Sequence, residues 1–177
     1  MLVKRWRVAL IACLGFARCA TTTETVPLLE SNGIPVTLTP HDLVALEVVT
    51  RGTAVPDPLP VRGAHVAYSD VEAALGHAVS SGAVPWAEKH REQRPEGFRL
   101  LVEPIRAEAS YDGQRLIFDL GVRATLRARK GNEYLAQTQA WCRQSALMKA
   151  AEGGPVIYAC MTHLGRELAG WLGAVEP

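Results

Sequence analysis

The chain has 177 residues, of which 48% are apolar and 21% are charged, and these ordinary values argue against wholesale disorder. Nineteen Lys and Arg nearly balance eighteen Asp and Glu, and the net charge of +1 argues against a dedicated nucleic-acid binder. Four cysteines are too few for a mini-protein scaffold built on disulfides. This length predicts one compact domain beside an anchoring segment.

The N-terminus has the layout of an export signal. Three basic residues within the first seven precede the mainly apolar, uncharged run 8–17, which Arg18 ends. The run is well short of the roughly 20 apolar residues that a membrane-spanning helix needs. A buried N-terminal helix is the alternative, but the basic residues cluster ahead of the run instead of lining one helical face. We therefore interpret residues 1–18 as a signal peptide.

Two cysteines near the end of this signal are candidates for lipid attachment. Cys19, which Ala20 and three threonines follow, resembles the first residue of a mature bacterial lipoprotein, although Arg18 stands where that family has a small residue. Cys13 completes a better lipobox, Leu-Ile-Ala-Cys, but only a short apolar run precedes it. We favour Cys19; lipidation of Cys13 and cleavage without a lipid remain the alternatives.

The rest of the chain divides into a tether and a domain. Residues 19–40 are rich in Thr and Pro and show little periodicity, which indicates a lipidated N-terminus with a flexible tether. Residues 41–177 then form a single domain. Its first strand is expected over 43–50, because β-branched residues are frequent there. Five Gly and Pro residues in 51–66 predict an irregular loop.

A helix is expected to begin at Ser69, where Ser69 and Glu72 have the spacing of a capping box. Apolar residues recur at helical spacing from Val71 to Val79, and Gly82 is expected to end the helix. Pro85 is suited to opening a second short helix, whose charged residues indicate a solvated surface.

The strongest pattern in the chain is a period-two alternation between 116 and 129, which predicts a strand with one buried and one solvated face. A strand at 98–102 precedes it, and an Asp-Gly turn lies between the two. A second turn at 130–133 leads into a strand over 134–143, so the three strands form an antiparallel meander. The even-numbered apolar residues of the central strand are Leu116, Phe118, Leu120, Val122, Ala124, Leu126 and Ala128.

The last element is an amphipathic helix that opens at Gly154-Pro155 and carries apolar residues on one face as far as Leu172. One apolar helix face needs one apolar partner, and the buried face of the meander provides it. The expected fold class is therefore α+β. An antiparallel sheet of about four strands is packed on one face by two main helices.

Cys142 lies on the inward register of the last strand, and Cys160 lies on the apolar stripe of the final helix. In an exported protein, two cysteines that converge on one interface favour a disulfide. Two buried free thiols are the alternative. A catalytic pair of Cys160 with His163 would need an exposed thiolate, whereas the stripe buries Cys160.

No other pattern in the sequence indicates chemistry. The five histidines lack metal-ligand spacing, and the acidic residues form no identifiable catalytic pair. We therefore expect no enzymatic activity, no metal and no cofactor.

The order of elements resembles small Gram-negative envelope lipoproteins, particularly the auxiliary lipoproteins of ABC-type lipid-transport systems. The resemblance covers most of the chain, but only as a pattern of elements: Cys19 with the threonines after it, the helix 70–80, the alternating 116–129, and the end of the last helix, 164–172. It implies a non-catalytic subunit that faces the periplasm, is anchored to the inner or outer membrane, and docks onto a larger machine or handles lipid. No functional residue of that family can be matched here.

Arg123, Arg127 and Arg129 form one row on the solvated face of the central strand and are the candidate contact for an acidic partner or a lipid head group. An ordinary solvated strand face is the alternative for this row. For the whole protein, the alternative function is a secreted or periplasmic small-ligand-binding module with a pocket between sheet and helices.

Overall fold

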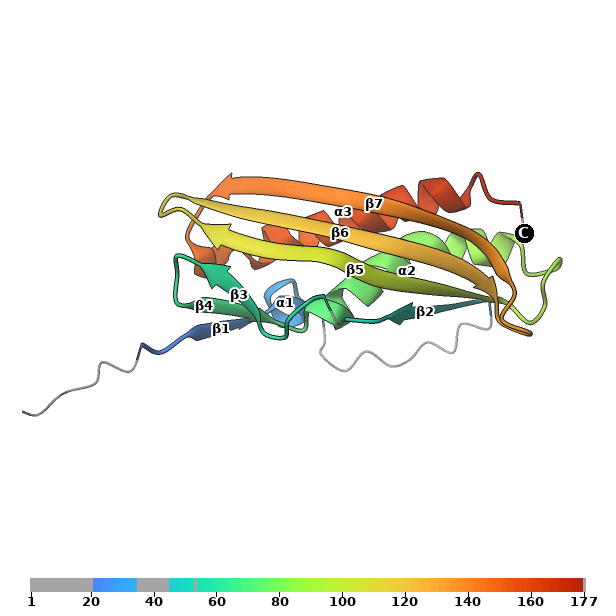
Figure 1. Cartoon of the computed structure of the whole chain (residues 1–177), viewed down its shortest axis with the longest axis horizontal. Coiled ribbons are helices and arrows are strands. Elements are labelled where there is room, and N and C mark those ends of the chain that lie inside the picture. Colours follow the sequence, from blue (N-terminus) through green and yellow to red (C-terminus); the bar gives the residue numbers. More distant parts are fainter. Residues whose placement is uncertain (1–20, 35–44, 53, 177) are drawn as a thin grey trace, which may run out of the picture.

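The computed structural model describes residues 21–34, 45–52 and 54–176. Within them, one mixed sheet of seven strands carries two long helices on one of its faces (Figure 1). The elements in chain order are β1 (Glu24–Pro27), α1 (Leu28–Ser31), β2 (Leu46–Thr50), β3 (Leu59–Arg62), β4 (Val66–Ser69), α2 (Val71–Lys89), β5 (Phe98–Tyr111), β6 (Arg115–Ala128), β7 (Tyr134–Leu147), a 3-10 turn (Ala150–Glu152) and α3 (Gly154–Leu172).

The predicted antiparallel meander is confirmed as β5, β6 and β7, each of 14 residues. The strand order is β1-β4-β3-β5-β6-β7. The edge of β5 that faces away from β6 is shared by two short strands, since β2 pairs with its first five residues and β3 pairs with Ala109 and Ser110. β5 is thus the spine that joins the two ends of the sheet.

The expectation of a purely antiparallel sheet of about four strands is wrong, although the α+β class is confirmed. β1 pairs with β4, and β2 and β3 pair with β5, in parallel. β3 and β4 have four residues each; β3 lies within the Pro-rich stretch 51–66 that was expected to be a loop, and β4 begins at the end of that stretch. So short a strand shows too few alternations to be recognised, and Pro60 is tolerated because β3 is a short strand near the margin of the sheet.

The predicted strand over 98–102 continues to Tyr111, because β5 passes Pro104 through an irregularity in register between Pro104 and Arg106. Such a bulge accommodates the missing backbone donor of proline without ending the pairing with β6. The longer strand brings Arg106 and Glu108 onto the sheet.

The segment that was expected to be a tether is partly folded. β1 adds to the margin of the sheet, and Leu28 and Leu29 of α1 are completely buried. Residues 24–34 therefore belong to the domain, and only residues 20–23 separate Cys19 from β1. Two isolated leucines carry no periodicity, so the sequence offered no signal for this docking.

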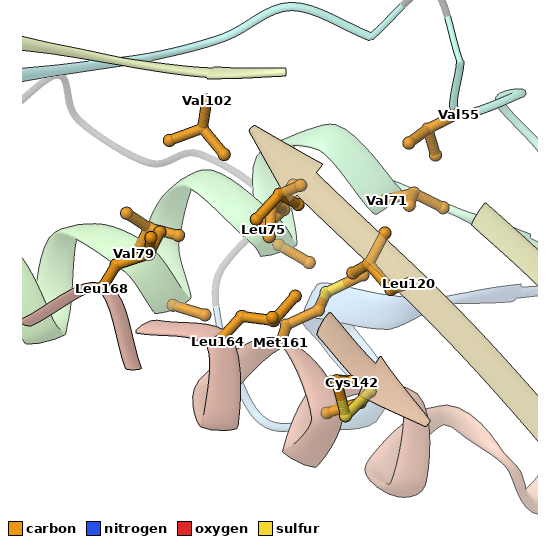
Figure 2. Packing of buried hydrophobic residues seen from close by; sticks show 14 of the residues in the cluster. Val55, Val71, Leu75, Val79, Val102, Leu120, Cys142, Met161, Leu164 and Leu168 are labelled. Carbon is orange, nitrogen blue, oxygen red and sulfur yellow. A yellow bond between two sulfur atoms is a disulfide. The ribbon is translucent and has the colours of Figure 1, made fainter. Parts of the chain in front are cut away.

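The buried face predicted for β6 is confirmed, although Thr125 on the opposite face is buried as well. All seven even-numbered side chains from Leu116 to Ala128 are at most 1% exposed, and they face α2 and α3. Figure 2 shows Leu120 of β6 near Val71 of α2 and Met161 of α3, and the same layer continues through Leu75 and Leu164 to Val79 and Leu168. These side chains form the centre of a single hydrophobic core.

α2 differs from its prediction at both ends. It begins at Val71 after Asp70, which has a left-handed backbone (φ 59°), and no side chain caps it, so the capping box is wrong. The helix does not end at Gly82 but continues through Pro85 to Lys89, in place of a second helix. Ala83, Trp86 and Ala87 are buried, and their burial holds the last turns despite the backbone hydrogen bond that Pro85 removes.

Gly82 and Gly165 let α2 and α3 cross closely. A Cβ atom at Gly82 would meet the carbonyl oxygen of Gly165, and a Cβ at Gly165 would meet the carbonyl oxygen of Ala78. Because these obstacles are backbone atoms, the helices would have to move apart to admit a methyl group. Gly82 therefore serves close packing and does not end its helix.

Gly165→Ala is expected to lower the free energy of unfolding by about 1–3 kcal/mol, the usual cost of overpacking a closely packed interior. Gly170→Ala in the same helix is the matched control, since a Cβ there meets nothing within 4 Å. That variant should keep or raise stability by up to about 1 kcal/mol. Urea unfolding of both variants gives the comparison, and equal stabilities would contradict the close-crossing account.

Candidate interaction face

The sheet face that points away from α2 and α3 carries the candidate site. Odd-numbered side chains of β6 point to this outer face, together with their register partners on β5 and β7. Arg123 and Arg127, two residues of the predicted row, are half-buried there. Arg129 lies just beyond the end of β6 and is exposed, so the row leaves the strand at its third member.

At the end of the sheet where β2 lies, the arginines gather around one carboxylate. Arg99 pairs in register with Arg127, and its Nε is 2.8 Å from Oε2 of Glu47. The same Glu47 oxygen is 3.9 Å from Nε of Arg129. Arg127 donates from Nη1 to the carbonyl oxygen of Asn132 at 3.0 Å and has no carboxylate partner among the described residues. Glu47 thus neutralises only part of the positive charge.

These side chains surround a shallow, open depression of about 440 Å³. Its floor includes Val49 and Leu101, and its lining is completed by three arginines, one carboxylate and one amide: Arg51, Arg99, Arg127, Glu47 and Asn132. An apolar floor with an excess of guanidinium groups suits a carboxylate-bearing or phosphate-bearing surface, because guanidinium forks bind such groups in two-point contacts.

Arg123 lies four residues before Arg127 on β6. Its register partners are Glu103 on β5 and Gln139 on β7. Its Nε is buried and has no hydrogen-bond partner in the described part of the chain. A buried guanidinium donor without an acceptor is costly. Arg123 is therefore the least satisfied cation of the row.

Trp141 of β7 lies beside Arg123 on the same face and is 50% exposed. Its register partner is Gly121 of β6, where any Cβ atom would overlap the indole ring. Gly121 therefore allows the ring to lie flat across β6, with Arg143 next to it on β7. Among the large side chains, Trp and Arg are the two that most often dominate binding at protein interfaces.

Sequence reasoning found only part of this face. The alternation of β6 identified Arg123 and Arg127, but Arg99, Glu47 and Arg51 were missed. Outward alternation within 98–102 was a signal for Arg99, whereas the position of Glu47 and Arg51 follows from parallel pairing of β2 with β5, which no local pattern reveals. Trp141 also belongs to this face, and half of its surface is exposed.

The predicted disulfide is present on the other face of the sheet. Cys142 of β7 and Cys160 of α3 are joined, with their Cα atoms 5.7 Å apart, and both side chains are buried. Figure 2 shows the bond beside the core. Cys160 therefore carries no thiol that might act with His163, and His163 lies 3.4 Å from Glu167 in an exposed ion-pair geometry.

The space between sheet and helices, where the ligand-binding alternative expects a pocket, is filled by core side chains. Val102, Phe118 and Leu164 are among the many residues with 0% exposure in this layer. The depression described above lies on the opposite face of the sheet. Cys19 and Cys13, the candidate lipidation residues, lie outside the described residues. No described helix has the length and apolarity that crossing a bilayer requires.

No protein-family model and no curated protein matches this sequence. Solved structures do share its fold. A Xanthomonas campestris protein of family DUF330 has a TM-score of 0.53 and 16% identity, with 72% of this chain and 82% of that chain covered. A "putative lipoprotein" from Caulobacter crescentus CB15 has a TM-score of 0.50 and 13% identity, with 78% and 97% covered. At these identities the likeness establishes a common α+β fold.

Replacing both Cys142 and Cys160 by Ala is expected to lower the free energy of unfolding by about 3 kcal/mol, because the bond closes a loop of 18 residues. Thermal unfolding with and without a reducing agent measures the effect. The reducing agent should lower the melting temperature of the wild type and leave that of the double variant unchanged. Equal melting temperatures of the wild type and the double variant, both measured without reducing agent, would contradict a stabilising bond.

Proposed function

We propose that this chain is a non-catalytic envelope lipoprotein, anchored through a lipid on Cys19, whose outer sheet face docks an acidic protein partner. The observation that carries the proposal is the incompletely neutralised arginine face at one end of the sheet. Resemblance to auxiliary lipoproteins of lipid-transport systems, noted from the order of elements, suggests that the partner belongs to a membrane transport or assembly machine. The small-ligand-binding alternative has lost support, because the sheet–helix layer is filled.

The proposed anchor lies close to the folded domain. Glu24, the first residue of β1, is five positions after Cys19, and an extended chain of that length spans at most about 18 Å. A lipid on Cys19 would therefore hold the β1 end of the domain near the bilayer surface. The disulfide supports an oxidising compartment such as the periplasm, where such bonds persist.

The arginine depression lies at the other end of the molecule. β1 reaches β5 through β4 and β3 near Ala109, whereas Arg99 lies ten residues earlier on β5, or about 34 Å along the strand. Figure 1 shows β1 and β2 at opposite ends of the long axis. An anchor at the β1 end would leave the depression facing away from its own membrane. We therefore favour an acidic protein surface over a lipid head group as the occupant.

Lipidation is tested by metabolic palmitate labelling and cell fractionation. The wild type and Cys13→Ser should carry label and sediment with membranes, whereas Cys19→Ser should lose both properties, because it lacks the thiol that accepts the lipid. Label that disappears only in Cys13→Ser would move the anchor to that residue, and an unlabelled wild type in the soluble fraction would contradict the anchoring proposal.

The docking face is tested with the triple variant Arg123→Gln, Arg127→Gln, Arg129→Gln. Cross-linking of the full chain in cells of the source organism, followed by mass spectrometry, should yield an envelope protein with an acidic surface. Its recovery should fall by about tenfold or more in the triple variant, since close charge pairs contribute strongly to such interfaces. Thermal stability should fall little, because Arg129 is exposed and the half-buried Arg123 and Arg127 have no carboxylate partner among the described residues.

The matched control is Lys89→Gln, Arg91→Gln, Arg166→Gln, which removes the same charge at exposed positions on or just after the helices, off this face. The control should retain the cross-linked partner. If the partner is lost equally from the row variant and from the control, the effect comes from net charge alone. If the row variant recovers as much partner as the wild type, the docking face is refuted. Loss of binding to phosphatidylglycerol vesicles, with partner recovery unchanged, would identify a lipid head group as the occupant instead.

A further inference from the structure

β7 is the edge strand of the sheet, and its outer side pairs with no strand among residues 21–34, 45–52 and 54–176. The strand has 14 residues, so it presents a long row of backbone N–H and C=O groups. Natural edge strands are usually protected by charged side chains, prolines, or short length. β7 contains no proline, and Arg143 is its one charged residue.

The most exposed large hydrophobic side chains of the described chain all lie on this strand. They are Tyr134, Trp141 and Leu147, which are 56%, 50% and 74% exposed. They are spread from one end of β7 to the other. Trp141, at its middle, is held flat by Gly121 and is already ordered before any partner binds. Such a strand is a site for strand addition.

We propose that β7 pairs antiparallel with β7 of a second copy of this chain, about a two-fold axis at Trp141, so that the two sheets become one continuous sheet. Outward side chains face outward side chains across an antiparallel pair, which requires the numbers of opposite residues to share parity. The register centred on Trp141 satisfies this requirement and pairs residues 136–146 of both strands, up to the irregularity at Leu135.

The outward contacts between residues 137 and 145 are compatible in this register. Trp141 lies opposite Trp141 of the second copy, and Leu147 lies opposite the start of β7 of the second copy, where Tyr134 is exposed. Gln137 faces Ser145, and Gln139 faces Arg143, each from the opposite copy. The one charge on the strand is therefore placed opposite a neutral acceptor and never opposite its own symmetry mate, which would repel it.

Charge decides between a second copy and an acidic extended peptide as the occupant. A peptide selected by charge needs several cations along the strand, and β7 has one. A second copy instead places Trp141 opposite Trp141, and Leu147 near the exposed Tyr134 at the start of the opposite strand. This inference is independent of the proposed docking face, because the arginine depression lies on the surface of the sheet and strand addition uses its edge.

Cysteine cross-linking tests the register in the full chain. In the double variant Gln137→Cys, Ser145→Cys, each new thiol should face its counterpart in the second copy at the short Cβ separation that a disulfide requires. Within one chain the two residues are eight positions apart, about 27 Å along the strand. Oxidised membranes should therefore give a covalent dimer on a non-reducing gel.

The single variants Gln137→Cys and Ser145→Cys are the matched controls, because each thiol would lie about 27 Å from its own symmetry mate. They should stay monomeric on the same gel, as should the wild type, whose Cys142 and Cys160 are already paired. Equal cross-linking in single and double variants would indicate random collision and overturn the proposed register. A double variant without any covalent dimer would overturn it as well.

Charge substitutions at the exposed Gln139 give a second test that leaves the core untouched. Gln139→Arg places two like-charge contacts with Arg143 across the axis and should weaken dimerisation about tenfold, whereas Gln139→Glu should strengthen it by a similar factor. Gln139→Arg combined with Arg143→Gln restores the original type of contact and should restore the wild-type dissociation constant.

Sedimentation velocity of the detergent-solubilised full chain measures these constants. A wild type that stays monomeric at every concentration would overturn the proposal. A dimer whose dissociation constant is the same in the wild type and in all three variants would show that association uses another surface. That result would overturn the proposal too. Circular dichroism of each variant should match that of the wild type, which excludes misfolding as the reason for a lost dimer.

Discussion

The burial of one face of β6 against α2 and α3 is the constraint on which the rest of the structure depends. Seven alternate side chains of this strand have almost no solvent exposure, and both long helices pack over them. Since side chains alternate strictly along a strand, burying the even positions forces Arg123 and Arg127 onto the opposite, solvated face. The core and the candidate interaction face are therefore two consequences of one alternation.

Two further features stabilise this layer without belonging to the alternation itself. The disulfide links β7 to α3 across the layer, and the glycine crossing brings α2 and α3 close enough to cover the sheet together. The cysteine pair was predictable from the faces of its two elements, whereas two glycines within helices give no such signal. Their effect is rigidity beneath the outer face, so that side chains such as Trp141 are presented on a fixed surface.

Long, regular elements were predictable, and short or irregular ones were not. The meander and α3 follow from periodicity sustained over many residues, whereas β3, β4 and α1 have only four residues each. The candidate site divides in the same way. The outward position of Arg123 and Arg127 follows from the alternation of one strand. Their arrangement beside Arg99 and Glu47 depends on which strands pair with one another, and local sequence does not indicate that pairing.

The sequence by itself determined the α+β class, the inward and outward faces of the meander, and the convergence of Cys142 with Cys160, because each depends on local periodicity. Only the tertiary structure decided that residues 24–34 join the domain, that β2 and β3 share one edge of β5 in parallel, and that β7 is left as an edge. These are long-range pairings between backbone groups. Since every residue except proline offers the same backbone donor and acceptor, side-chain identity alone does not select the partner strand.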